Sequence, residues 1–158
     1  MKKMKFIISL LLLSTLAGCN SDDSNNHVKG TLIFGWFASS NCSGDCSQIF
    51  KIDGTNVYQN INHDYPDTPF FEGEFELMTD VNYQDYKVLL NQLPSEIHAE
   101  PNGYLDCTDC TNENGGFYLE FEDDNGIRKS WRFRNTVFPE YMESYRSLLL
   151  EKIAELSS

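Results

Sequence analysis

The sequence predicts a single α+β domain in which an antiparallel sheet of about five to six strands is covered by two helices. Short segments rich in aromatic and β-branched residues recur along the chain, and turn residues separate them. Two longer segments carry apolar residues at helical spacing, one in the middle of the chain and one at its end. The resulting order is three or four strands, a helix, a hairpin and a helix, which indicates an antiparallel α+β sandwich.

The first three strands are expected between residues 31 and 59. Thr31–Ala38 is apolar on both faces, which predicts a central strand buried on each side. Ser47–Asp53 and Asn56–Gln59 flank the dipeptide Asp53-Gly54, a strong signal for a tight turn between two strands. Asn62–Pro69, which contains two prolines, is expected to be a loop.

A fourth strand is predicted over Phe71–Leu77, because charged residues alternate there with apolar or small ones. Alternation with a period of two puts one set of side chains on the buried face and the other set in solvent. The predicted inner set is Phe71, Gly73, Phe75 and Leu77, and the outer set is Glu72, Glu74 and Glu76.

A helix is expected next, capped by Thr79 or Asp80 and ended by Pro94. Its apolar residues form one stripe at helical spacing, namely Tyr83, Tyr86, Leu89, Leu90 and Leu93. A stripe of this composition is more typical of a core-facing surface than of a ligand site.

The following hairpin, Phe117–Glu122 with Ile127–Arg134, has the best-determined register in the chain. A two-residue loop would put Leu119 opposite Arg132 and mix polar with apolar side chains on both faces. A three-residue loop, 124–126, instead pairs Leu119 with Trp131 and puts Gly126 where a left-handed conformation is needed. The same register pairs Glu122 with Arg128. The basic residues Arg128, Lys129, Arg132 and Arg134 are therefore interpreted as exposed cross-strand partners of Glu120 and Glu122 rather than as a binding patch.

The last helix is expected to begin at Pro139, which suits a first turn, and to run to about Leu156. One of its faces is apolar and should cover the sheet; it comprises Tyr141, Met142, Tyr145, Leu148, Leu149, Ile153 and Leu156.

The beginning of the chain has the three parts of an export signal. A positive segment precedes an apolar segment of about 11 residues, which is too short for a bilayer that needs about 20. These parts are Lys2, Lys3 and Lys5, then Phe6–Leu16, then Leu16-Ala17-Gly18-Cys19. The last four residues resemble the lipobox of bacterial lipoproteins. That resemblance implies that Cys19 becomes the first mature residue and carries the lipid anchor. Apart from this covalent lipid we expect no cofactor, with zinc at the four other cysteines as the minor alternative.

This resemblance divides the chain into a signal peptide (1–18), an acylated flexible tether (19–29) and one α+β domain (30–158). It also implies an outer-membrane location, since Asn20 is not the aspartate that retains many lipoproteins in an inner membrane. Asp22 and Asp23 either resemble the acidic export signal of surface lipoproteins or belong to a solvated tether. The domain would accordingly lie at the periplasmic face or at the cell surface.

Charge limits the classes of partner. The 158-residue chain has a formal charge of −12, and removal of three lysines with residues 1–18 leaves −15. Phosphates of nucleic acids and of anionic lipid surfaces would repel such a domain, so we expect no nucleic-acid partner. A basic protein or peptide is a plausible partner, and the membrane is contacted through the lipid. An aromatic fraction of 13% argues against disorder.

The four remaining cysteines form two close pairs in polar loops, Cys42 with Cys46 and Cys107 with Cys110. An even count in an exported chain favours two structural disulfides within these pairs. Two alternatives remain. The four thiolates could hold zinc, since one pair has the spacing of a zinc knuckle. Cys107 and Cys110 could instead form a redox-active dithiol, although no helix is predicted after them.

Other catalytic patterns are weak, so we expect no enzyme. His63-Asp64 could be an acid–base pair but has no nucleophile beside it, and no calcium loop or phosphate loop is recognised.

Beyond the signal, the chain is similar to small uncharacterised bacterial lipoproteins with paired cysteines and a Gly-Gly before a strand, here Gly115-Gly116. We expect a non-enzymatic, lipid-anchored binding or structural module of the cell envelope. The alternative is an inhibitor or immunity-type protein that binds a basic enzyme or toxin through its acidic surface.

Overall fold

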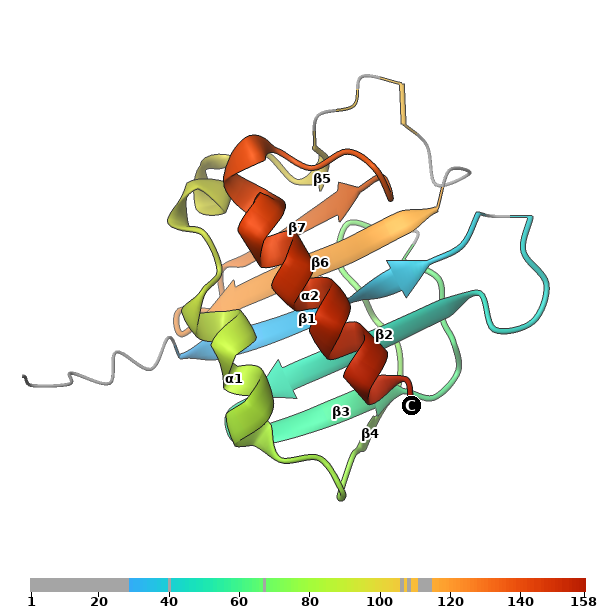
Figure 1. Ribbon diagram of the computed structural model, residues 1–158, viewed down its shortest axis with the longest axis vertical. Coiled ribbons are helices and arrows are strands. Elements are labelled where there is room, and N and C mark those ends of the chain that lie inside the picture. The colour runs from blue at the N-terminus through green and yellow to red at the C-terminus, as the bar shows by residue number, and fades with distance from the viewer. Residues whose placement is uncertain (1–28, 40, 67, 106, 108, 111–114) are drawn as a thin grey trace, which may run out of the picture.

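A seven-stranded mixed sheet forms the centre of the domain in a computed structural model of the chain (Figure 1). The structure describes residues 29–39, 41–66, 68–105, 107, 109–110 and 115–158. The strand order across the sheet is β4-β3-β2-β1-β6-β7-β5. The strands are β1 (Gly30–Phe37), β2 (Ser47–Asp53), β3 (Asn56–Asn60), β4 (Phe75–Leu77), β5 (Gly103–Tyr104), β6 (Gly116–Asp123) and β7 (Arg128–Phe133).

The α+β class is confirmed, but the number and direction of the strands differ from expectation. The additional strand, β5, has two residues and pairs with β7 in the parallel direction, so the sheet is mixed. All other neighbouring strands are antiparallel. The central position predicted for the first strand is confirmed, because β1 lies between β2 and β6. The predicted β2–β3 hairpin is also confirmed, with Gly54 at a φ of 62° in its turn.

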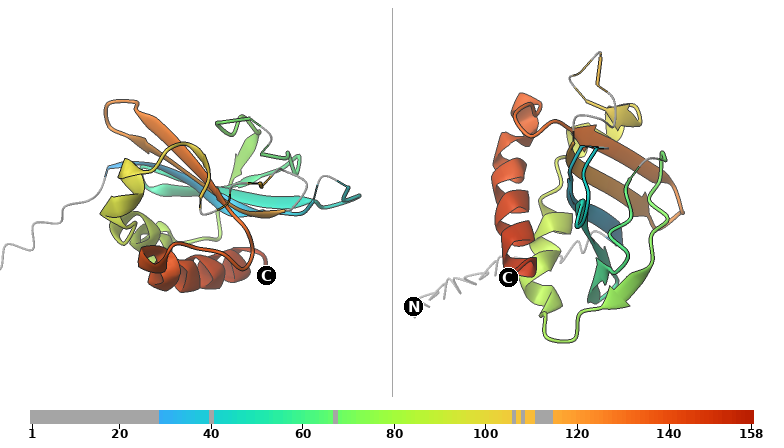
Figure 2. Two further views of the ribbon diagram at one scale, coloured as in Figure 1. Left: turned by 90° about the horizontal axis from the view of Figure 1, so that it is seen from above. Right: turned by 90° about the vertical axis from the view of Figure 1, so that its right-hand side faces the viewer.

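Both helices pack on one face of the sheet (Figure 2). They are α1 (Tyr83–Asn91) and α2 (Glu143–Leu156), and the short 3₁₀ helices η1 (Ser95–Ala99) and η3 (Glu140–Met142) accompany them. Leu89 of α1 and Leu149 of α2 are completely buried against Phe34, Leu119 and Trp131 of the sheet. The predicted apolar faces of both helices are thus core faces.

The beginning of each helix differs from expectation in detail. The cap of α1 is Asn82, whose side-chain oxygen accepts a hydrogen bond from the backbone N–H of Gln84, and not Thr79 or Asp80. Residues 79–82 include three good capping types, so local sequence alone does not select among them. Pro139 precedes the 3₁₀ turn η3, which leads directly into α2.

A long loop, residues 61–74, crosses the other face of the sheet, and we call it the covering loop (Figure 2). The prediction of a strand over Phe71–Leu77 is therefore wrong for its first half: only Phe75–Leu77 pairs with β3. Phe71 is buried against Ile33, Ile49 and Tyr118 on this second face. An extended loop alternates its side chains as a strand does, so the pattern could not reveal the missing strand partner.

The predicted β6–β7 register is confirmed. Leu119 pairs with Trp131 and Glu122 pairs with Arg128. The turn is closed by a hydrogen bond from the Asp123 N–H to the Ile127 carbonyl, and Gly126 has a φ of 77°. The alternation of buried and exposed side chains along the two strands was thus sufficient to determine the loop length.

Candidate functional site

The two cysteine pairs form the disulfides predicted from the sequence. Cys42 is bonded to Cys46 and Cys107 to Cys110, with Cα–Cα distances of 5.7 and 5.5 Å. The first disulfide lies in the loop after β1 and the second in the loop before β6. Since the last residue of β1, Phe37, pairs with the first residue of β6, Gly116, both loops leave the sheet at the same end.

The glycine pair before β6 has a structural reason. Gly116 has a φ of 152°, and an added Cβ would lie 1.9 Å from the Phe133 carbonyl oxygen. Gly115 has a φ of 63°, and an added Cβ would lie 2.9 Å from the carbonyl carbon of Ala38. Both glycines therefore allow close contact between backbones at the beginning of β6.

The sequence-adjacent pair His63-Asp64 is not brought together as an acid–base pair. His63 has a positive φ of 52°, and its Nδ1 lies 3.0 Å from the carbonyl oxygen of Ser47. Its Nε2 lies 3.7 Å from Asp45 in the first disulfide loop. The Asp64 carboxylate instead accepts a hydrogen bond from Asn60. His63 thus connects the covering loop to the disulfide end, and the neighbouring Ser47 hydroxyl donates to the Asp64 carbonyl at 2.8 Å rather than to the imidazole.

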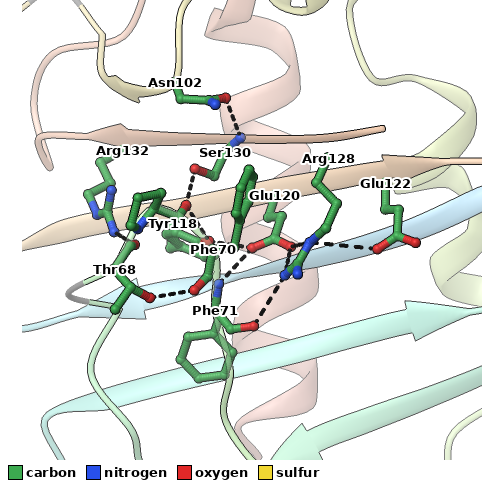
Figure 3. A network of polar contacts seen from close by, with 11 residues as sticks. Thr68, Phe70, Phe71, Asn102, Tyr118, Glu120, Glu122, Arg128, Ser130 and Arg132 are labelled. Atoms are coloured by element: carbon green, nitrogen blue, oxygen red, sulfur yellow. Dashed lines mark hydrogen bonds and ion pairs between the residues drawn. The ribbon is translucent and has the colours of Figure 1, made fainter. Parts of the chain in front are cut away.

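Sequence reasoning missed a buried polar network beneath the covering loop (Figure 3). Its centre is Glu120, which is only 2% exposed. Arg128 donates to Oε1 of Glu120 from Nη2 at 2.5 Å and from Nε at 2.8 Å. The other oxygen, Oε2, accepts from the Tyr118 hydroxyl at 2.5 Å and from the Phe71 N–H at 2.8 Å. Both carboxylate oxygens are thereby satisfied, as a buried charge requires.

Further along the sheet, the same network holds the covering loop by its backbone carbonyls. Arg132 donates from Nη2 to Pro66 at 2.6 Å and also to Thr68, and the Ser130 hydroxyl donates to Pro69. We call the five sheet residues of this network the clamp residues: Tyr118, Glu120, Arg128, Ser130 and Arg132. They attach a loop to the sheet across more than 45 residues of sequence.

The electrostatics of the clamp suit attachment rather than proton transfer. Burial, followed by the charge of Glu120 and the hydrogen bond to it, raises the pKa of Tyr118 well above the ordinary value for a phenol. The pKa of Arg128 is also raised, because its bonds to Glu120 and its attraction to that carboxylate outweigh the opposing effect of burial. The phenol and the guanidinium therefore keep their protons at neutral pH.

The basic residues of β7 match only part of the expectation. Arg128 does bridge Glu120 and Glu122, which lies 3.6 Å from it. The expectation of exposed pairs is wrong for Glu120, which is buried. Lys129 instead donates to the backbone carbonyl of Glu100, and Arg132 donates to that of Pro66. Nothing in the local sequence could indicate such partners, because carbonyl acceptors leave no residue pattern.

A groove of about 630 Å³ lies at the β4 edge of the sheet, next to the start of α1 and the end of α2. We call it the acidic edge groove, because Glu76, Asp80, Asp85 and Glu155 line it. Among the described residues in its lining there is no lysine, arginine or histidine. Lys152 stands near it and is bonded to Glu155 at 2.9 Å. Ile61 and Leu77, also in the lining, are 42% and 46% exposed.

The predicted lipid anchor, Cys19, lies outside the described residues. Within the described part of the chain, no helix is long and apolar enough to cross a membrane. The same residues include no group of three or more His, Cys, Asp or Glu side chains that could hold a metal ion. Comparison with known proteins finds no match, since neither a family model, nor a curated protein, nor a solved structure is similar to this chain.

Proposed function

We propose that this protein is a non-enzymatic, lipid-anchored binding module of the bacterial cell envelope, and that the two disulfide loops form its recognition surface. The anchor part of the proposal rests on the resemblance of Leu16–Cys19 to a lipobox. The binding part rests on where the loops lie relative to the tether.

The observation that carries the proposal is the direction of β1. The expected tether joins the domain at Gly30, the first residue of β1, whereas the first disulfide loop follows Phe37 at the other end of this strand (Figure 1). The second disulfide loop precedes Gly116, which pairs with Phe37. A strand rises about 3.4 Å per residue, so the eight residues of β1 separate the two ends by about 24 Å. A lipid at the tether would leave the disulfide end free to meet a partner.

The short span of the disulfides supports a role in recognition rather than in stability. Their cysteines are separated by 4 and 3 residues, so each bond restricts few unfolded conformations. Their main effect is to fix the shape of two polar loops. A preformed loop loses less conformational entropy on binding than a flexible one.

Two variants test the two parts separately. Cys19→Ser should leave an unprocessed precursor without lipid, because serine cannot form the thioether, and detergent-phase partitioning should distinguish it from the wild type. Equal partitioning of wild type and variant would reject the anchor. Replacement of Cys42, Cys46, Cys107 and Cys110 by serine should keep the anchor and abolish crosslinking to envelope partners. Unchanged crosslinked products would reject the disulfide end as the recognition surface.

A second candidate function is inhibition or neutralisation of a basic enzyme or toxin. The acidic edge groove supports it, because its carboxylates are concentrated on one edge of the sheet. Electrostatic attraction of this kind weakens steeply with ionic strength. Capture of a cationic partner that is lost in high salt supports this candidate, and capture that is insensitive to salt contradicts it.

A further inference from the structure

We propose that the edge strand β4 binds an extended basic segment of a partner protein by strand addition, with the acidic edge groove receiving its lysine or arginine side chains. This inference deepens the second candidate function and rests on it. Four properties of the β4 edge support it: outward-facing backbone groups, three carboxylates without an ion-pair partner among the described residues, exposed apolar side chains and a charge pattern that disfavours self-association.

The backbone of β4 offers hydrogen bonds on its outer side. β4 is the terminal strand of the sheet, with β3 on one side only. The inner side is occupied by Glu74, Glu76 and Met78, since the Glu74 carbonyl accepts from Ile61, Glu76 pairs with Gln59, and Met78 donates to Val57. In an antiparallel pair the bonding direction alternates, so the N–H and C=O groups of Phe75 and Leu77 point outward. Four groups are thus available to an added strand.

The two faces of this edge differ in charge. Glu76 lies on the helix-covered face, where the groove is lined further by Asp80 and Asp85. Within the described part of the chain, no ion pair joins any of these three carboxylates to a basic side chain. On the opposite face, Lys51 lies over the rings of Tyr58 and Phe75, at 4.5 and 4.8 Å from their centroids.

This difference determines the chemistry of the added strand. Its side chains must alternate between the two faces, as in any strand. Those on the helix-covered face meet carboxylates and are expected to be lysine or arginine. Those on the other face meet Leu77, Tyr58 and the ammonium of Lys51, and are expected to be apolar. Ile61, exposed on the groove side, supports the methylene chains of the basic residues.

A second copy of this chain does not fit the edge. Glu72, Glu74 and Glu76 are all exposed, so pairing β4 with another β4 would bring carboxylates opposite one another. Nucleic acid is disfavoured by the same charge. The acidic side chains also do not converge as metal ligands among the described residues. An extended basic peptide satisfies both the backbone groups and the charges.

A synthetic alternating Lys-Val peptide of about eight residues, the length of an ordinary strand, provides the test. Binding to the mature chain is measured by fluorescence anisotropy at about 50 and about 500 mM salt, which changes the screening length severalfold. The matched probe carries N-methyl groups on alternate residues, so it keeps the charge but cannot donate to the edge. We expect the unmethylated peptide to bind at least about tenfold more tightly, a difference of about 1.4 kcal/mol.

Charge-reversal variants locate the binding site. Glu76→Lys and Asp80→Lys should each weaken binding about tenfold, whereas Glu96→Lys, which changes an exposed residue outside the groove, should not change it. Thermal melting checks folding, and Glu76→Gln supplies a milder change. In NMR spectra of the wild type, the amide signals of Phe75 and Leu77 should shift most.

The outcomes separate this inference from the function on which it rests. Peptide binding that survives N-methylation, or that Glu96→Lys weakens as much as Glu76→Lys, overturns strand addition and leaves a general attraction for cationic proteins. Absence of binding at both salt concentrations overturns strand addition and contradicts the second candidate function as well.

Discussion

Replacement of Glu120 by alanine should detach the covering loop and strongly destabilise the domain. The change removes Oε1, which accepts two hydrogen bonds from the Arg128 guanidinium, and Oε2, which accepts from the Tyr118 hydroxyl and the Phe71 N–H. Arg128 then keeps a partly buried charge without its main partner, since its side chain is 32% exposed. The hydroxyl and the amide lose their partners in a buried environment.

The expected magnitude follows from these losses. Removal of one member of a buried ion pair costs about 3–5 kcal/mol, mainly because the other charge remains buried. An unsatisfied hydroxyl or amide adds about 1–3 kcal/mol, but the contributions of one network are not additive. We therefore expect the free energy of unfolding to fall by about 3–5 kcal/mol, a large fraction of the 5–15 kcal/mol that is typical of a domain.

Urea denaturation of a soluble form beginning at Asn20 measures this change, and Glu122→Ala is the matched control. Glu122 lies on the same strand and faces the same arginine at 3.6 Å, but it is 42% exposed. Loss of the Glu122 carboxylate should lower the free energy of unfolding by less than about 1 kcal/mol. Hydrogen exchange at the Phe71 amide should accelerate in Glu120→Ala only. Equal destabilisation by the two alanine variants would refute the reasoning, because it would mean that burial of the network contributes nothing.

Three further predictions concern the turn, the disulfides and one histidine. Gly126→Val should lower the free energy of unfolding by about 1 kcal/mol or more in a denaturation experiment, because a φ of 77° is unfavourable for valine. The effect should come from backbone strain alone, since no atom lies within 4 Å of an added Cβ. Replacement of both Cys107 and Cys110 by serine should lower the free energy of unfolding only slightly, at the low end of the range of about 0–5 kcal/mol known for disulfides. The intact mass of the wild type should be lower by four hydrogens than that of the fully reduced chain, because two disulfides are present. Partial desolvation beside the rings of Phe121 and Trp131, followed by repulsion from Lys129, lowers the pKa of the His98 imidazole from its ordinary value of 6.5. Since the folded state binds this proton less readily, stability should fall as pH decreases through 6.5 toward the folded pKa, and His98→Gln should reduce this dependence. A larger loss of stability at high pH than at low pH would contradict that sign.

The β6–β7 hairpin and the disulfides could be predicted because the deciding information is local. A shift of one residue would have put Arg132 opposite Leu119, so the hydrophobic pattern allowed a single register. The close spacing of Cys42–Cys46 and Cys107–Cys110 favoured pairing within each loop over the other connectivities.

The clamp could not be predicted because its partners are distant and carry no side-chain signal. Arg132 bonds carbonyl groups 66 and 64 residues earlier in the chain. The two-residue strand β5 is too short to have a hydrophobic pattern. The covering loop resembled a strand near Phe71 because burial of alternate side chains does not depend on whether a neighbouring strand provides hydrogen bonds.

The hydrogen bonds from the clamp residues reach the covering loop through its peptide groups, while the Phe71 side chain packs in the core beneath it. Carbonyl oxygens of Pro66, Thr68, Pro69 and Phe71 and the amide of Phe71 make the contacts, while the side chains that bind them belong to the sheet. Every residue type supplies a carbonyl, so substitutions at exposed loop positions such as Thr68 should leave its path unchanged. The sheet thus fixes the path of the loop backbone, and new side chains could be introduced at the exposed loop positions without redesigning the fold.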